Sequence, residues 1–249
     1  MDAPAPSPLA RLVVMLTACA MACAAFAALG AWQVERLVWK RALIARVERN
    51  VHAVPVAAPG PAQWGQLTSE DEYRRVQASG RFEAGREVLV AATTALGGGY
   101  WVLTPLRTEQ GAWLLVNRGF VPPDLRGKVP APATQGEVVG LLRSSETGGR
   151  PLQQNDPAAG RWYSRDVAAI AAAQGLTGLV APYFVDQVAA PGAAPQWPRP
   201  GLTVLSFRNN HLAYALTWFA LAAIMAAALV FVVLDARRQR RGAPDAPPC

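Results

Sequence analysis

The sequence predicts a membrane protein of the α+β class, in which two transmembrane helices flank an extracytoplasmic β-rich domain, either an antiparallel sheet or a small barrel. Residues 12–34 and 209–234 contain no charged residue, and each run exceeds the roughly 20 helical residues that cross a bilayer. Between them lie short strand-like runs separated by Gly and Pro. Of the 249 residues 52% are hydrophobic and 16% charged, which argues against a wholly soluble or disordered chain.

The predicted organisation follows from these two runs. The first helix should continue past the bilayer to about Asn50, because no Gly or Pro interrupts it before Pro55, and residues 53–66 should form a loop. We predict an N-terminal leader over residues 1–11, a first membrane helix over 12–34, the β-rich domain over 35–208, a second membrane helix over 209–234 and a basic cytoplasmic tail over 235–249.

Strand patterns dominate the central domain. Glycines 97–99 predict a flexible turn before a hairpin that Pro122 and Pro123 end. Asp166 predicts the cap of a short helix that reaches about Gln174, and a linker rich in Pro, Gly and Ala over residues 191–201 leads to the second span. The predicted strands are residues 73–82, 87–91, 100–106, 112–121, 138–142 and 182–188.

The first apolar run is a membrane anchor or a signal peptide. Its 23 residues exceed the apolar region of about 7–15 residues that is typical of signal peptides, which favours an anchor. The tripeptide from Ala25 to Ala27 resembles a cleavage site, so cleavage is the alternative.

The charges that flank the two spans disagree about topology. The first span is followed by five basic residues, which alone would place the central domain in the cytoplasm. Long translocated domains largely escape the charge rule, so we infer the topology from the short tail with its basic residues Arg237 and Arg238. We therefore predict a multi-pass protein of the bacterial inner membrane with both termini cytoplasmic and the central domain in the periplasm.

The inventory of reactive groups is small and disfavours a conventional enzyme. The chain has two histidines, His52 and His211, and none of the common hydrolase, zinc-protease, thiol-redox or nucleotide-binding motifs. The region between the two spans is only mildly basic, with 19 Lys and Arg against 14 Asp and Glu, and shows no pronounced signature of nucleic-acid binding. Cys19 and Cys23 share a helical face, either as a metal or redox pair or, as we favour, as small residues at a helix contact.

His211 opens the second apolar run and is the most informative polar residue. At about 100° per residue, Tyr214 and Trp218 lie within about 60° of it, which gives a His/Tyr/Trp stripe. Such a stripe suits an axial haem ligand with aromatic neighbours. The alternative is an interfacial histidine in an aromatic belt, with Asn209 or Asn210 capping the helix.

Four segments together resemble the surfeit locus family of cytochrome c oxidase assembly factors. One departure is Phe120, where the family often has Trp. The matching segments are Gly-Ala-Trp-Gln-Val-Glu-Arg-Leu-Val-Trp-Lys (residues 30–40), Tyr-Trp-Val-Leu-Thr-Pro-Leu (100–106), Leu-Val-Asn-Arg-Gly-Phe-Val-Pro (115–122) and Asn-Asn-His-Leu-Ala-Tyr-Ala-Leu-Thr-Trp (209–218).

The resemblance implies a non-enzymatic role in the maturation of haem–copper oxidase, by haem a delivery to, or insertion into, oxidase subunit I. His211 matches the family's membrane histidine, a proposed ligand of haem iron. Gln33 and Arg36 are candidates for haem propionates or for lipid phosphates. The full set of expected haem contacts is His211, Tyr214, Trp218, Trp32, Gln33 and Arg36.

Expected partners are oxidase subunit I, proteins of haem a biosynthesis or other assembly proteins, and the lipid bilayer. Arg118, Gly119, Asn209 and Asn210 are candidate partner-binding residues. Arg118 either binds a carboxylate, of a partner protein or of a haem propionate, or pairs with a group within its own domain. Gly119 is expected at a turn with positive φ.

Two rival functions remain open. One is a haem-free membrane chaperone that stabilises nascent subunit I, and the other is a membrane-anchored sensor or ligand-binding domain. His52 is a conceivable second axial ligand in the haem hypothesis.

Overall fold

The computed structural model describes residues 7–149, 153–203, 207 and 209–241. Most of the predicted leader (residues 1–6) and of the basic tail (residues 242–249) therefore lies outside the described residues. The chain forms two compact units, one of Ala45–Ser206 and the other of Met1–Ile44 with Phe207–Cys249.

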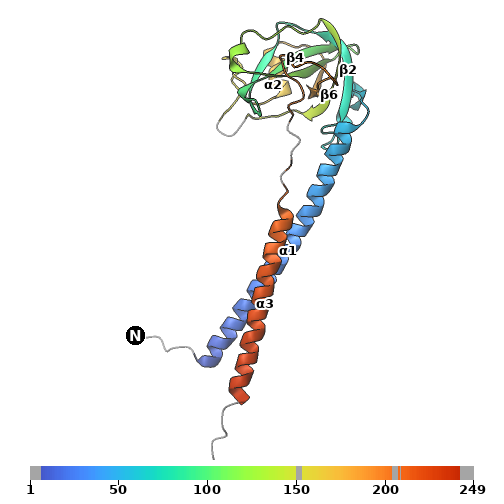
Figure 1. Cartoon of the computed structure of the whole chain (residues 1–249). Coiled ribbons are helices and arrows are strands. Elements are labelled where there is room, and N and C mark those ends of the chain that lie inside the picture. Colours follow the sequence, from blue (N-terminus) through green and yellow to red (C-terminus); the bar gives the residue numbers. More distant parts are fainter. Residues whose placement is uncertain (1–6, 150–152, 204–206, 208, 242–249) are drawn as a thin grey trace, which may run out of the picture. The chain divides into compact units, whose positions relative to one another are not determined.

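Two long helices, α1 (Pro8–His52) and α3 (His211–Arg241), run side by side (Figure 1). Both are long and apolar enough to cross a membrane, judged by length and composition, over Leu9–His52 and His211–Arg238. The continuation of α1 past the first apolar run confirms that prediction.

The two helices meet along a seam with the 3.5-residue period of a coiled coil. Its most buried residues include Gly30, Ala215 and Ala222, small residues that let helix backbones approach. Cys19 and Cys23 are half-buried free thiols in this seam. Steps of three and four residues connect the seam positions Leu12, Leu16, Cys19, Cys23, Phe26, Gly30, Gln33, Leu37 and Lys40 of α1, and His211, Ala215, Trp218, Ala222, Met225, Leu229, Val232 and Ala236 of α3.

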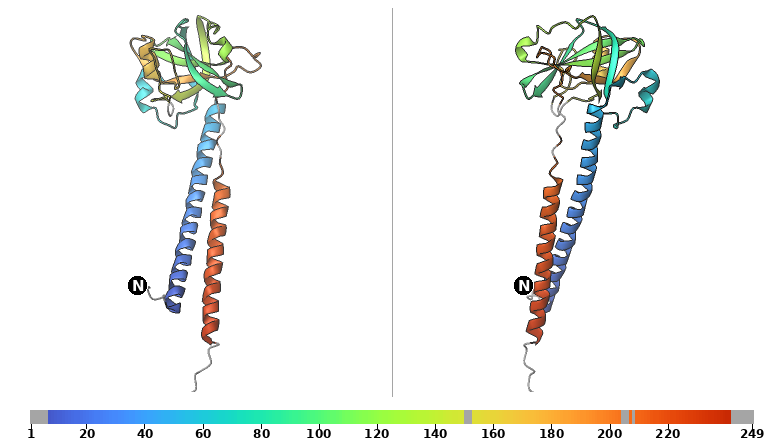
Figure 2. Two further views of the ribbon diagram at one scale, coloured as in Figure 1. Left: turned by 90° about the vertical axis from the view of Figure 1, so that its left-hand side faces the viewer. Right: turned by 45° about the vertical axis from the view of Figure 1, so that its right-hand side comes forward.

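The other unit contains a closed barrel of five strands, which confirms the predicted β-rich domain (Figure 2). The strands follow the order β2-β6-β7-β5-β4, and pairing of β4 with β2 closes the ring. The pairs are antiparallel except β5 with β7, which is parallel because the chain passes through β6 and a helix before it returns beside β5. The barrel strands are β2 (Arg75–Phe82), β4 (Gly97–Thr108), β5 (Trp113–Val121), β6 (Gln135–Ser144) and β7 (Val180–Gln187).

Smaller elements extend the sheet and cover the barrel. Strand β3 (Val88–Thr94) pairs with β4, and β1 (Val56–Ala57) pairs with β2. Helix α2 (Val167–Ala173) begins after Asp166, whose side chain accepts a hydrogen bond from the Ala169 amide, as predicted for its cap. The 3-10 helices are η1 (Pro61–Gln66) and η2 (Pro123–Leu125).

Two apolar clusters form the core of this unit. One has members on all five barrel strands, including Val76 and Leu114, and Trp64 of η1 packs against it. The other includes Phe184 and Ile170, and it binds the opposite face of the sheet to α2. Strands β5 and β7, which are buried on both faces, supply alternate residues to the two clusters and so produce this division.

The prediction of a turn at glycines 97–99 is wrong. These residues begin β4 and pair with Thr94, Thr93 and Ala92 of β3. Gly99 is needed there because a Cβ atom would lie 2.4 Å from the Val121 carbonyl oxygen. Residues 53–66, predicted as a loop, contain the short elements β1 and η1.

A buried carboxylate, Asp186 on β7, joins several parts of the unit Ala45–Ser206, which we call the barrel unit. The residue is 2% exposed. Its Oδ1 atom accepts hydrogen bonds from Asn117 Nδ2 at 2.7 Å and Arg165 Nη1 at 3.0 Å. Its Oδ2 atom accepts from Arg143 Nη1 and Thr203 Oγ1, both at 3.0 Å. One carboxylate therefore connects β5, β6 and the segments that precede α2 and follow β7.

Two further carboxylates complete this charge network. Glu72 accepts from Arg143 Nε at 2.7 Å, and Glu146 pairs with Arg165. Burial opposes the ionisation of Glu146, but the hydrogen bonds and the charge of Arg165 outweigh it, so the pKa of Glu146 lies below its ordinary value of 4.5.

Substitution Asp186→Asn should destabilise the barrel unit strongly. It removes the buried carboxylate that Arg143 and Arg165 share and leaves them only Glu72 and Glu146, a change that costs about 3–5 kcal/mol in free energy of unfolding. Asp156→Asn is the matched control, because that carboxylate belongs to an exposed pair with Arg161 and should leave stability near the parent. Denaturant unfolding of the full chain in detergent measures both, and equal stability of the two variants would contradict a central role for Asp186.

Acid should weaken the network through Glu146. Because its pKa is lowered in the folded state, its stabilisation is complete above pH 4.5 and is lost as the pH falls through the lowered value. We expect the melting temperature of the parent to fall more steeply below pH 4.5 than that of Glu146→Gln, which should be less stable at pH 7. Parallel curves for the two proteins would show that this ion pair does not contribute.

Candidate functional site

The unit of Met1–Ile44 and Phe207–Cys249, which we call the helix unit, contains a polar pair between its two apolar helices. Gln33 of α1 is 9% exposed, and its Oε1 atom lies 2.7 Å from Nδ1 of His211, the first residue of α3. An amide oxygen only accepts hydrogen bonds, so Nδ1 is the donor in this pair, and a neutral ring held in this way has its lone pair on Nε2. A histidine in this state can bind a metal through Nε2 while its other nitrogen is held in place.

Aromatic packing continues along the seam from this pair. Gly30 is one turn before Gln33, and a Cβ atom there would lie 2.6 Å from the ring of Phe219. Phe26 stacks on Trp218 with ring centroids 5.7 Å apart. Gly30 therefore gives Phe219 room to pack against α1, and the stack holds Trp218.

The other predicted haem contacts are not joined to His211. Trp32 and Tyr214 are 50% and 55% exposed, on the outer surfaces of their helices. The Arg36 guanidinium lies over the ring of Trp39 at 4.6 Å. Within the described part of the chain, the His211 ring is hydrogen-bonded to Gln33 and to none of these three.

The asparagines before α3 differ in their surroundings. The backbone carbonyl of Asn210 accepts the first helical hydrogen bond, from the Tyr214 amide at 3.2 Å. The Oδ1 atom of Asn209 is buried and has no hydrogen-bond partner among the described residues. Asn210 therefore begins the helix through its backbone, and Asn209 keeps an unused acceptor.

Sequence reasoning missed Phe26 and Phe219. Both lie near residues that the motifs contain, Trp218 and Gly30. Alternating steps of three and four between the small and polar residues of each apolar run were the available signal, because they indicate a helix seam.

A second group of motif side chains, in the 115–122 segment, lies on β5 of the barrel unit. Asn117 donates to Asp186 and, through Oδ1, accepts from the Gly119 amide at 3.1 Å. Gly119 has a positive φ of 132°, but it lies within β5 and not at the turn that was expected, and a Cβ atom there would clash with the Arg199 carbonyl group. Phe120 exchanges two backbone hydrogen bonds with Arg199, at 2.9 and 2.8 Å. These residues attach the segment after β7 to the barrel.

Arg118 has only part of its hydrogen-bonding capacity satisfied. Its Nη2 atom donates to the Pro130 carbonyl at 2.9 Å, whereas Nη1 is buried and has no partner among the described residues. Burial lowers the pKa of Arg118, and the charge of Glu87 acts in the opposite direction. The partner inside its own domain is thus a carbonyl group, and no carboxylate among the described residues forms an ion pair with Arg118.

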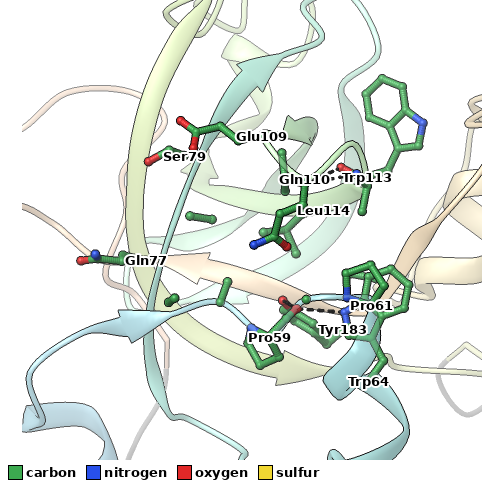
Figure 3. Close-up of a pocket in the computed structure, with 17 residues that line it drawn as sticks. Pro59, Pro61, Trp64, Gln77, Ser79, Glu109, Gln110, Trp113, Leu114 and Tyr183 are labelled. Atoms are coloured by element: carbon green, nitrogen blue, oxygen red, sulfur yellow. Dashed lines mark hydrogen bonds between the residues drawn. The ribbon is translucent and has the colours of Figure 1, made fainter.

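A separate cavity of about 190 Å³ lies beside η1 (Figure 3). The Pro59 carbonyl oxygen accepts from the Tyr183 hydroxyl at 2.8 Å and from Trp64 Nε1 at 2.9 Å. Burial raises the pKa of Tyr183, so the group remains a neutral phenol. Both donors are already used within the barrel unit, which makes this cavity a weaker site for a ligand.

Gly119→Ala should loosen the segment after β7. The added Cβ would meet backbone atoms and hold a non-glycine residue at φ 132°, a strain of about 1–3 kcal/mol. We expect faster hydrogen exchange at the Phe120 and Arg199 amides. Gly136→Ala is the control, because its nearest contact would be an ordinary 3.9 Å to the Phe82 ring. Equal exchange in both variants would contradict the proposed attachment.

Comparison with known proteins places these features in a family. The model of the SURF1 family matches residues 20–223, a range that includes Gln33, His211 and residues 115–122. Surfeit locus protein 1 of Homo sapiens is 35% identical over 223 residues, covering 78% of this chain and 69% of the relative. The SURF1-like protein of Monosiga brevicollis is 32% identical over 221 residues, covering 82% of each chain. The helix pair, the barrel and their motif residues therefore form one matched unit of sequence, and the chain belongs to the SURF1 family.

Proposed function

We propose that this chain is a cytochrome c oxidase assembly factor that assists haem a delivery to, or insertion into, oxidase subunit I. Membership of the surfeit locus family supports the assembly role. The observation that supports haem binding is the hydrogen bond between Gln33 and His211.

The chemistry of the residues around His211 fits a haem. Histidine is a common axial ligand of haem iron, and metal-bound histidines almost always donate their second ring N–H to an acceptor. Gln33 provides that acceptor, at 2.7 Å from Nδ1. His211 would bind the iron through Nε2. Tyr214 and Trp32, which are exposed on the outer surfaces of their helices, would offer aromatic surface to the macrocycle there, whereas the Trp218 ring is stacked on Phe26.

Arg36 suits a haem propionate on the same grounds. It is exposed, and no described carboxylate forms an ion pair with it. A guanidinium group over an aromatic ring still has N–H donors at its edge, which can bind a carboxylate. When bound, haem a would be cargo that the protein holds and passes on unchanged, so the proposed role is not enzymatic.

The proposed location is the bacterial inner membrane, with both termini in the cytoplasm and the barrel in the periplasm. Two candidate spans, α1 and α3, support a membrane location. The basic residues in the last turns of α3 favour a cytoplasmic C-terminus, and two spans place both termini on the same side. Subunit I and proteins of haem a biosynthesis or assembly are the proposed partners.

A haem-free chaperone of subunit I is the second candidate, because the same hydrogen bond admits another interpretation. Polar side chains that bond across two membrane helices also serve simply to hold the helices together. In that case Gln33 and His211 would fix the helix pair, and the protein would stabilise subunit I without touching haem.

Spectra of purified variants should distinguish these candidates. We expect a reduced-minus-oxidised haem a band in the full-length protein purified from cells that make haem A, and its loss in His211→Ala. Gln33→Ala should weaken haem affinity by about 10–100-fold, the usual effect of removing the partner of a metal-bound histidine. His52→Ala is the matched control: this ring, proposed above as a conceivable second axial ligand, lies exposed beside Glu48 at the C-terminal end of α1, far from Gln33, and we expect it to be dispensable.

Each other outcome has a defined meaning, provided that circular dichroism shows the variants to be folded. A band that persists in His211→Ala would assign the ligand to another residue. No band in any protein, despite abundant haem A, would contradict haem delivery and favour the haem-free chaperone.

A further inference from the structure

The barrel unit contains a groove made of two adjoining cavities. Their volumes are about 380 and 480 Å³, and both are lined by Glu137 of β6, Gln187 of β7, Gln196 and Pro200. Because they share these residues, the two cavities adjoin each other, and we call them together the arginine groove. All its residues belong to Ala45–Ser206.

Three arginines line the arginine groove and give it an excess of positive charge. Arg118 lines one cavity, and Arg75 and Arg199 line the other. Glu137 is the only acidic residue among the lining residues of either cavity, so the formal balance is two positive charges. This sign favours an anionic ligand.

Two of these guanidinium groups have unused buried donors. Arg118 Nη1 and Arg75 Nε are both inaccessible to solvent and have no hydrogen-bond partner among the described residues. Buried polar groups are normally satisfied, and each exception calls for an explanation. These two atoms lie beneath the surface, but both arginine residues are partly exposed, so a ligand with two separated carboxylates would meet one guanidinium charge in each cavity.

The walls of the arginine groove suit an extended chain. Its apolar walls come from proline residues and Trp197, which is 36% exposed. The side chains of Gln187 and Gln196 can donate to and accept from a peptide backbone. Gly119 and Phe120 fix one wall by holding Arg199, whose guanidinium lies 5.4 Å from the Trp197 ring.

We propose that the arginine groove binds an extended acidic segment of a partner polypeptide, with one carboxylate at Arg118 and another at Arg75. Charge-assisted hydrogen bonds to guanidinium groups would fix its register, and the amides of Gln187 and Gln196 would bind its main chain. The inference does not depend on haem binding, because the groove lies wholly within the barrel unit and His211 lies in the other.

Fluorescence anisotropy with a labelled hexaglutamate peptide tests the proposal on the full chain in detergent. We expect saturable binding of hexaglutamate and none of hexaglutamine. Arg118→Gln and Arg75→Gln should each weaken binding about tenfold or more, because each removes a hydrogen-bonded charge. Arg118→Lys keeps the charge but loses the fork of donors, and should bind with intermediate affinity.

Two controls separate this site from general electrostatics and from haem binding. Arg107→Gln removes a positive charge outside the groove, over Trp113 at 4.9 Å, and should bind hexaglutamate like the parent. His211→Ala should also bind hexaglutamate like the parent, so a negative result for haem binding would not contradict the proposal for the arginine groove.

Several results would overturn the proposal. These are equal binding of hexaglutamine, parent-like affinity in both Arg118→Gln and Arg75→Gln, and absence of hexaglutamate binding. Displacement of the peptide by equimolar inorganic phosphate would assign the groove to a small anion, and displacement by phosphatidylglycerol vesicles would assign it to lipid headgroups.

Discussion

A polar side chain between two apolar helices needs a polar partner, because neither lipid nor an aliphatic neighbour can satisfy it. Gln33 is in this position, and the His211 ring satisfies it at 2.7 Å. A shift of either helix by one residue would break that bond and turn the seam residues away from each other. The hydrogen bond therefore fixes the register in which Phe26 meets Trp218 and Gly30 receives Phe219.

The same requirement organises the barrel unit. Asp186 is almost completely buried, and the guanidinium groups of Arg143 and Arg165 satisfy it together with Asn117. Since Asn117 also accepts from the Gly119 amide, the charge network reaches the residues that hold the segment after β7. Residues 115–122 are thus connected to the core at one side and to the arginine groove at the other, which explains why the segment combines a polar, a charged, a flexible and an aromatic residue.

Local patterns were sufficient to predict much of this fold. Charge-free length predicted the two helices, alternation predicted the strand of Arg75–Phe82, and a single acidic residue predicted the start of α2. The turn expected at glycines 97–99 lies instead at residues 95–96, and Gly99 is required by a neighbouring strand, at the Val121 carbonyl, and not by the local chain. Closure of the barrel by β2 and β4 likewise depends on pairing between distant residues.

The candidate site likewise combines residues that the sequence predicted with contacts between distant residues that it could not predict. The motif residues His211 and Gln33 were predicted separately, but their hydrogen bond joins residues 178 positions apart and follows only from the antiparallel seam. Arg36 and Trp39 form a cation–π pair that the sequence did not predict. The unused donor of Arg118 was equally hidden, because it depends on the Pro130 loop that buries the guanidinium group.

The protonation state of the His211 ring tests the central claim most directly. The chain has two histidines, so ¹⁵N-histidine labelling of the haem-free protein gives two rings, and His52→Asn assigns them. The account predicts that His211 carries its proton on Nδ1 and leaves Nε2 bare at pH 8, and that Gln33→Ala abolishes this preference. A proton on Nε2 of His211 in the parent protein would contradict the claim that Gln33 prepares this histidine to bind a metal.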